Sequence, residues 1–236
     1  MKLHVKFYRL SMNKYETIKK IEKFAPPELA ENWDCSGWIV ETDCQEISRI
    51  MLALTVTGNV IKQALNTECG MIISHHPLFH VPVDWKKIDI YCAHTNLDKT
   101  TGGTTDTLIA DLGLNVSETK DFLRFVNCEY KVNEFIKKLK KISPNLRYIN
   151  NRNTKIIKKI AFCAGSGFEF LEEAKYLGAD AFVSGDLKFH RALESDIVLF
   201  DAGHFETETG VLKVLASLID ETEIVYAKEH SPFIYP

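Results

Sequence analysis

Short apolar runs alternate with amphipathic segments along most of the chain. The apolar runs are rich in Ile, Val, Leu and Ala and predict strands that are covered on both faces. These predicted strands are residues 47–56, 71–74, 89–93, 156–163, 181–184, 197–200 and 223–227. Apolar positions at helical spacing predict helices at 14–24, 28–32, 59–66, 107–112, 132–139, 168–177, 190–195 and 207–219. Strands that alternate with helices are typical of βαβ units, so we expect the α/β fold class with largely parallel or mixed sheets.

The pattern divides the chain into two lobes of similar design. A first α/β lobe at 14–126 follows an N-terminal extension at 1–13, and a second α/β lobe covers 154–236. Residues 127–153 form a connecting segment, in which a lysine-rich amphipathic helix is followed by polar residues. This segment is too short for an inserted domain. Strands end in His and Asp residues in both lobes, which suggests a duplicated unit.

The composition excludes several classes of function. Of the 236 residues, 45% are hydrophobic and 26% charged, which is typical of a globular protein. A net charge of −3 offers no basic face, so we expect no direct binding of nucleic acid or of an anionic membrane surface. No apolar run reaches the roughly 20 residues that span a bilayer. Residues 1–11 mix charged with apolar side chains and do not resemble a secretory signal.

The six cysteines are scattered, and no Cys-x-x-Cys pair is present in the sequence. This spacing argues against a disulfide framework and against a thiolate zinc site. Reduced cysteines are typical of cytosolic proteins, so we expect a cytoplasmic location.

Two adjacent histidines, His75 and His76, follow the predicted strand 71–74 and precede Pro77. Pro77 favours an extended backbone before it and removes a hydrogen-bond donor, so the strand should end there. Imidazoles at the carboxyl end of a buried strand are well placed to enter a ligand crevice. A His-His pair in a surface loop is the alternative, and it stays open at this point.

Two further segments place His and carboxylate residues where a predicted strand ends. They are His94 with Asp98, and His204 with Glu208. Four residues apart on a helix, His204 and Glu208 would share one face about 6 Å apart at Cβ, whereas Glu206 would point elsewhere. Imidazoles mixed with carboxylates suit zinc, manganese or iron better than calcium or magnesium. Five or more ligands exceed what one catalytic zinc takes, so the count favours two divalent metal ions that share a carboxylate.

Four blocks of the sequence resemble the signature of one family. They are Ser74-His-His-Pro-Leu-Phe79, Ala93-His-Thr-Asn-Leu-Asp98, Ser184-Gly-Asp-Leu-Lys-Phe-His190 and Asp201-Ala-Gly-His-Phe-Glu-Thr-Glu208. Further segments that fit are Trp33-Asp34, Gly165-Ser-Gly167, Gly178-Ala-Asp180 and Ser231-Pro-Phe233. The chain therefore resembles the YbgI-like family, also called NIF-three-like and commonly named GTP cyclohydrolase 1 type 2.

The resemblance implies a two-lobed protein with a dinuclear metal site in the cleft between the lobes, and a homo-oligomer, often a hexameric ring. The metal ligands that it implies are His75, His76, Asp98, His204 and Glu208. Glu208 is expected to bridge the two metals. His94 and His190 match positions that line the site, and we assign them to substrate contact or proton transfer, with support of the metal ligands as the alternative. Asp186 either belongs to this site or caps the following helix.

The chain departs from the family pattern at positions that bear on substrate specificity. Thr55 lies in a segment where an acidic residue usually ends the first long strand. Cys35 and Trp38 replace the usual Asn and Leu, and Glu41 stands where Gly is common. All five implied ligands remain.

Two functions are compatible with this resemblance. The first is a metal-dependent hydrolase that acts on a nucleotide-like small molecule, with GTP as the substrate that the family implies. Its phosphates would need Lys188, Arg191 or the Gly165-Ser-Gly167 turn. The second is a non-enzymatic metal-binding scaffold or regulatory protein that acts through partner interactions. Both functions would use the same ligands, so the sequence leaves both open.

Overall fold

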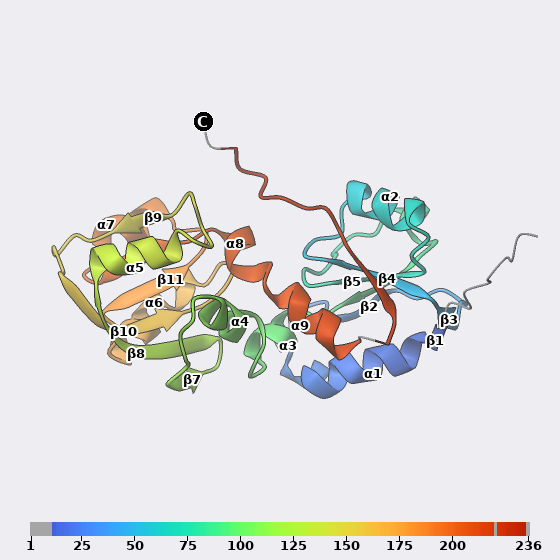
Figure 1. The fold of residues 1–236 in the computed structure, drawn as a ribbon, viewed down its shortest axis with the longest axis horizontal. Helices are drawn as coiled ribbons and strands as arrows, with labels where there is room; N and C mark the ends of the chain where they lie inside the picture. The colour runs from blue at the N-terminus through green and yellow to red at the C-terminus, as the bar shows by residue number, and fades with distance from the viewer. Residues whose placement is uncertain (1–10, 220, 235–236) are drawn as a thin grey trace, which may run out of the picture. The chain divides into compact units, whose positions relative to one another are not determined.

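A computed structural model describes residues 11–219 and 221–234, so residues 1–10 of the predicted N-terminal extension lie outside the described residues. The chain divides into two compact units. The first unit comprises residues 1–96 with 215–229, and the second comprises residues 97–214 with 230–236. Each unit contains one large sheet covered by helices (Figure 1). Two helices, α3 (Thr95–Lys99) and α9 (Val211–Leu218), run from one range into the other.

The first unit is built on a five-stranded sheet. Its elements are β1 (Met12–Asn13), α1 (Lys14–Phe24), the 3-10 helix η1 (Pro27–Leu29), β2 (Gly37–Val40), β3 (Glu46–Ile47), β4 (Arg49–Ala53), α2 (Gly58–Asn66), β5 (Met71–Ser74), the 3-10 helix η2 (Val83–Trp85), β6 (Asp89–Cys92) and β13 (Glu223–Tyr226). The strand order is β13-β4-β5-β6-β2, and only β2 is antiparallel to its neighbour. Side chains of α2 pack on one face, and α1 lies on the opposite side (Figure 1).

The second unit is built on a six-stranded mixed sheet. Its elements are α4 (Thr104–Asp111), β7 (Glu118–Lys120), β8 (Leu123–Lys131), α5 (Val132–Leu139), β9 (Arg147–Ile149), β10 (Ile156–Phe162), the 3-10 helix η3 (Phe168–Phe170), α6 (Leu171–Tyr176), β11 (Ala181–Ser184), α7 (Phe189–Glu194), β12 (Val198–Asp201) and α8 (His204–Glu208). The strand order is β7-β8-β10-β11-β12-β9, with β10, β11 and β12 parallel. Helices α4 and α5 pack on one face and α6 on the other.

The predicted α/β class with parallel and mixed sheets is confirmed. Strands predicted at 71–74 and 181–184 coincide with β5 and β11, and the helix predicted at 14–24 coincides with α1. All four residues of β5 and of β11 are buried, which explains why a continuous apolar run marks them. Among the described residues, every helix is too short or too polar to span a bilayer.

The structure differs from the prediction around the connecting segment. The polar residues predicted as a loop contain β9, which pairs antiparallel with β12 as an edge strand. An edge strand pairs on one side only and needs few apolar side chains, so its hydrophobic pattern in the sequence is weak. Strand β8 runs across the predicted boundary at residue 127. Strand β13, which the prediction placed in the second lobe, pairs with β4 in the first unit.

Candidate metal centre

The first unit carries its histidines at the carboxyl end of two neighbouring parallel strands. His75 and His76 follow β5, and their backbone N–H groups donate to the carbonyls of Ala53 and Leu54 at 3.2 and 2.8 Å. These bonds continue the ladder between β4 and β5 for two residues beyond the strand. The backbone of both histidines is therefore fixed by the sheet. His94 follows β6 in the same way, two residues after Cys92.

The three imidazoles of the first unit form one cluster. The ring centroids of His75 and His76 are 5.1 Å apart, those of His75 and His94 are 5.3 Å apart, and those of His76 and His94 are 5.9 Å apart. His75 is fully buried, whereas His76 and His94 are partly exposed. Three imidazoles at this spacing are unusual in a core, and the surface-loop alternative for His75 and His76 is wrong because the pair extends a buried strand.

Hydrogen bonds set the proton position on two of these rings. Nδ1 of His75 lies 2.9 Å from the carbonyl oxygen of Ala93, which can only accept, so Nδ1 carries the hydrogen. Nδ1 of His94 likewise lies 2.9 Å from Oδ1 of Asp34. Nε2 is then the lone-pair nitrogen of the neutral ring in both histidines. Orientation of an imidazole through its other nitrogen is the usual arrangement around metal-binding histidines.

His76 is held by the residue that departs from the family pattern. Oγ1 of Thr55 lies 2.7 Å from Nδ1 of His76. A carboxylate is also present at this position, but it comes from elsewhere in the chain. Oε2 and Oε1 of Glu229 accept hydrogen bonds from the backbone N–H groups of Leu54 and Thr55 at 2.7 and 2.9 Å. A carboxylate from the C-terminal segment thus binds the backbone just after β4.

Asp34 is the anchor of His94. Its carboxylate also accepts hydrogen bonds from the Thr95 hydroxyl at 2.5 Å, the Ser36 hydroxyl at 2.7 Å and the Cys35 backbone N–H at 2.7 Å. Burial alone would raise the pKa of Asp34, but the bonds from Thr95, Ser36 and His94 outweigh it and hold the pKa well below its usual range. Asp34 is therefore an ionised carboxylate at neutral pH, and it keeps the His94 ring in place.

In the second unit, Asp98 lies on α3, whose carboxyl end is held by a buried arginine. The Arg124 side chain is 0% exposed and donates to the carbonyls of Asp98, Lys99 and Thr100 at 3.4, 2.9 and 3.2 Å. Its Nε donates to the Asp106 carboxylate at 2.5 Å. A cation that binds the last carbonyls of a helix stabilises its end. Arg124 therefore fixes the turn that carries Asp98.

His204 and Glu208 form the second metal-competent pair of this unit. Both lie on α8, and Nε2 of His204 is 3.1 Å from Oε2 of Glu208. Nδ1 of His204 is 2.8 Å from Oδ2 of Asp186. Burial would lower the pKa of His204, but Glu208 and Asp186 outweigh it and raise the pKa to about 9 in the metal-free protein. The predicted sharing of one helical face is confirmed.

A glycine makes room for the Glu208 carboxylate. Gly165 has a φ of +66°, and a Cβ on it would lie 2.1 Å from Oε1 of Glu208. The Gly-rich turn at 165–167, considered above for phosphate binding, thus faces a carboxylate. This close approach accounts for the glycine and argues against a phosphate at Gly165.

The donor set fits a divalent transition metal. Groups of His, Asp and Glu side chains that could hold a metal ion are present among the described residues. Imidazole nitrogens with carboxylates are the ligands that zinc, manganese and iron accept. Gly165 also leaves space for the Glu208 carboxylate, which allows that carboxylate to serve as a metal ligand.

The remaining predicted residues occupy different environments. His190 is exposed on α7 and packs edge-on against Phe189, with 5.5 Å between the ring centroids. Asp186 does not cap α7, because Lys188 is its N-cap residue and no side chain caps the helix. Its φ of +60° turns the chain toward His204 instead. Sequence reasoning missed the roles of Asp34 and Arg124. The short motif Asp34-x-Ser36 was a sequence signal for the role of Asp34, whereas no sequence pattern indicated the role of Arg124.

The comparisons with known proteins agree with this architecture. The model of the family described as Duf34/NIF3 (NGG1p interacting factor 3) matches residues 12–232. A GTP cyclohydrolase 1 type 2 homolog of Clostridium perfringens is 34% identical over 91% of this chain and 95% of its own length. The chain therefore belongs to the Duf34/NIF3 family.

Solved structures share the fold. Reduced HcgD from Methanocaldococcus jannaschii superposes with a TM-score of 0.83 at 28% identity, covering 93% of this chain and 99% of that one. The protein ybgI, of unknown function, superposes with a TM-score of 0.85 at 20% identity, covering 94% of this chain and all of its own. At that identity the second likeness concerns the fold alone.

Proposed function

We propose that this protein binds two divalent metal ions through His75, His76, Asp98, His204 and Glu208, and acts as a metal-dependent hydrolase on a nucleotide-like small molecule. The observation that carries the proposal is the histidine cluster of the first unit. Hydrogen bonds to Ala93 and Asp34 place the hydrogens of His75 and His94 on Nδ1, so the lone pair of each neutral ring is on Nε2, the nitrogen that would bind a metal or a proton. The metals are zinc, manganese or iron by ligand type.

The residues of the chain would divide the work between metal binding and proton transfer. Bound divalent ions supply Lewis acidity and a nucleophile at neutral pH. His94 would take up and release a proton at Nε2, because its Nδ1–H stays bound to Asp34. The buried Asp34 carboxylate stabilises the imidazolium that forms when His94 accepts the proton. Glu208 would bridge the metals, and His190 would contact the substrate from α7.

The nucleotide-like substrate is supported by the names of the relatives. Several relatives, including that of Clostridium perfringens, are named GTP cyclohydrolase 1 type 2 homologs. GTP is therefore the first substrate to test. The proposal also includes a homo-oligomer, with a hexameric ring as its expected form, and a cytoplasmic location, which the six free thiols favour.

Turnover by metal-loaded protein tests the proposed activity. Wild-type protein and a His94→Asn variant are loaded with Zn²⁺, Mn²⁺ or Fe²⁺ and assayed on GTP and on a panel of nucleotides and phosphoesters. We expect hydrolysis by the wild type and a loss of about a hundredfold in the variant, because general acid–base catalysis contributes about 10²–10⁴ in rate. His80→Asn, at an exposed position of the same unit, is the matched control.

Metal analysis of the same samples separates the outcomes. If His94→Asn keeps its metals but loses turnover, the assignment of His94 to proton transfer holds. Full metal loading without hydrolysis of any compound would instead favour the metal-binding scaffold that acts through partners. A His80→Asn variant that loses as much activity as His94→Asn would contradict the specific role of His94.

A further inference from the structure

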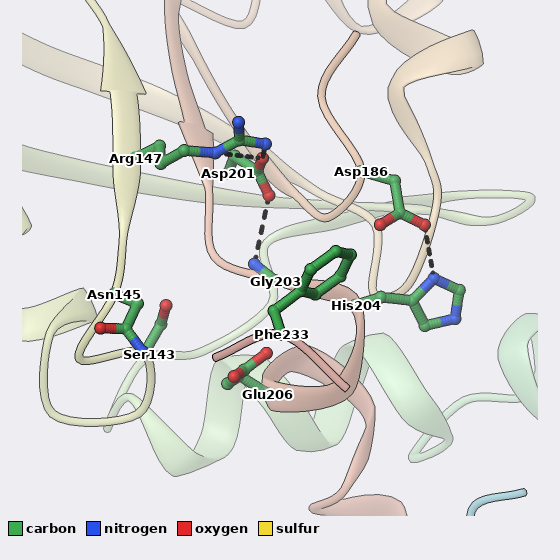
Figure 2. A pocket seen from close by; sticks show the side chains of 9 residues that line it. All are labelled: Ser143, Asn145, Arg147, Asp186, Asp201, Gly203, His204, Glu206 and Phe233. Carbon is green, nitrogen blue, oxygen red and sulfur yellow. Dashed lines mark hydrogen bonds and ion pairs between the residues drawn. The ribbon is translucent and has the colours of Figure 1, made fainter. Parts of the chain in front are cut away.

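A second polar site lies in the second unit, beside His204. It is a cavity of about 190 Å³ at the carboxyl ends of β11 and β12 (Figure 2). The residues that line it are Ser143, Asn145, Arg147, Asp186, Asp201, Gly203, His204, Glu206 and Phe233. Except for His204, none of them is among the proposed metal ligands. The volume is sufficient for a small organic group but not for a whole nucleotide.

Some of the charged groups in this pocket are already paired within the protein. Arg147, on β9, donates from Nε to Oδ2 of Asp201 at 3.1 Å, and its Nη2 contacts the same oxygen. Asp201 is 4% exposed at its side chain and also accepts from the backbone N–H of Gly203. Asp186 accepts from His204. Figure 2 shows the Arg147–Asp201 pair at the upper left and the Asp186–His204 pair at the right. These paired side chains form one wall of the pocket.

Two other groups are not paired. Ser143 is 2% exposed and lines the pocket, yet within 11–219 and 221–234 its hydroxyl has no hydrogen-bond partner. Within the same residue ranges, the carboxylate of Glu206 also has no hydrogen-bond partner. The Ser143 hydroxyl oxygen is accessible from the cavity and is not sealed in the core, so it can hydrogen-bond to a bound ligand. Glu206 folds over Gly203, where a Cβ would lie 2.2 Å from Oε2.

The charges around the cavity determine which ligand it accepts. The Arg147 guanidinium and the His204 imidazole face three carboxylates, those of Asp186, Asp201 and Glu206. Because His204 is paired with Asp186 and Arg147 with Asp201, the Glu206 carboxylate remains as the surplus negative charge. This surplus of negative charge repels phosphate and attracts cations. Phe233 is 65% exposed and lies across the pocket in Figure 2, so its ring face is available to a cation or to a planar group.

We propose that this pocket binds a small organic cation, namely a protonated amine or an amidine-type group. Its N–H groups would donate to Glu206 and to the Ser143 hydroxyl, and its planar or alkyl part would lie against Phe233. Because His204 lines the same pocket, the bound group would be the nitrogen-bearing end of the substrate. This assignment to the substrate rests on the proposed function. It narrows the proposed substrates to compounds that carry a cationic nitrogen group or several N–H donors.

Three isosteric probes test the charge preference directly. Benzamidine is a planar cation, benzamide is its neutral analogue and benzoate is its anionic analogue. Their binding to the full-length protein is followed by NMR shifts and calorimetry, with and without bound zinc. We expect saturable binding of benzamidine, at least about tenfold tighter than benzamide, and no saturable binding of benzoate.

Substitutions then locate the binding. Glu206→Gln keeps the shape and removes the charge, and we expect it to weaken benzamidine at least about tenfold. Glu134→Gln, an exposed glutamate on α5, is the matched control and should change nothing. Phe233→Ala alters an exposed side chain, so the fold should tolerate it, and we expect a loss of about threefold to tenfold because the ring face is removed.

The outcomes distinguish this inference from the proposed function. Benzoate binding as tightly as benzamidine, or benzamidine binding that neither Glu206→Gln nor Phe233→Ala weakens, would overturn the inference. These results do not depend on metal, because the metal-free protein contains the same pocket. Selective benzamidine binding by a protein that takes up no metal would support the pocket and refute the metal-dependent function.

Discussion

His75 and His76 of the first unit and His204 of the second present metal-competent imidazoles in different electrostatic settings, whereas His94 is paired with the Asp34 carboxylate. His75 and His76 are held at Nδ1 by uncharged groups, the Ala93 carbonyl and the Thr55 hydroxyl. His204 is held between two carboxylates, Asp186 and Glu208. Neutral partners orient a ring without favouring its protonation, whereas carboxylates favour the imidazolium.

This difference predicts that His204 must change its protonation state if the proposed metal binds. A metal takes the neutral imidazole, so a bound proton must first leave. With its pKa raised to about 9 in the metal-free protein, His204 carries that proton at neutral pH. A divalent ion would then replace the proton as the positive charge next to Glu208.

The largest effect on stability is expected at the anchor of the first cluster. Asp34→Asn would place an amide among five donors that now face a carboxylate, and the free energy of unfolding should fall by about 3 kcal/mol. Asp43→Asn, at an exposed position, should change it by less than about 0.5 kcal/mol. Urea unfolding at pH 7 measures both.

The pH dependence gives this prediction a second check. The pKa of Asp34 is depressed in the folded state, so its contribution is fully present above the unfolded pKa of about 3.9 and is lost as the pH falls through the folded value. Wild type and Asp34→Asn should therefore converge in acid. An equal difference at pH 7 and in strong acid would contradict the role assigned to the charge.

The next largest effect concerns the space around Glu208. Gly165→Ala should destabilise the protein by about 2 kcal/mol, because alanine at φ +66° is strained and its Cβ would displace the carboxylate. Gly113 also has a φ of +66°, but its Cβ would meet nothing within 4 Å, so Gly113→Ala isolates the strain. We expect only Gly165→Ala to weaken metal binding. Thermal unfolding and zinc titration of both variants measure the difference, and equal behaviour would refute the space-making role of Gly165.

A smaller effect is expected at the hydroxyl that orients His76. Thr55→Val keeps the shape and removes the contact at 2.7 Å, so metal affinity should fall about tenfold while stability changes by less than about 1 kcal/mol. Thr119→Val, at an exposed position of β7, serves as the control. Competition with a chelator of known affinity measures the loss. Unchanged affinity would show that Thr55 does not position the ring.

The smallest effect is expected at Asp186, whose side chain is 43% exposed. Asp186→Asn should lower the pKa of His204 in the metal-free protein, but Glu208 should keep it above its ordinary value. Because that pKa is raised on folding, the stability it contributes is present below about 6.5 and is lost as the pH rises through about 9. The variant should lose it at a lower pH. NMR titration of the ring measures the shift, and an unchanged pKa would contradict the pairing.

The sequence predicted the strands that position the candidate ligands better than it predicted which strands belong to each sheet. Buried strands such as β5 and β11 are marked by their own apolar runs, so their carboxyl-end residues could be placed directly. Strand β13 shows the same local pattern, but no local pattern tells which sheet a strand joins. Its pairing with β4 was missed for that reason.

Supporting residues were harder to predict than candidate ligands. Thr55 was seen only as a lost acidic contact, although it contacts His76 while Glu229 supplies a carboxylate to the neighbouring backbone. Glu229 is 174 residues away in sequence from Thr55, so this contact depends on the tertiary structure. Arg124 lies in a strand, and its burial against carbonyl groups leaves no signature in the sequence.

Metal stoichiometry tests the central claim most directly. Elemental analysis and Co²⁺ titration are carried out on the wild type and on His75→Ala and Glu208→Ala, with His80→Ala as an exposed control. The proposed ligands predict about two metal ions per chain in the wild type and the control, and a loss of at least one in each ligand variant. A wild-type protein that resists reconstitution with metal, or ligand variants that retain its full metal content, would contradict the proposed metal site.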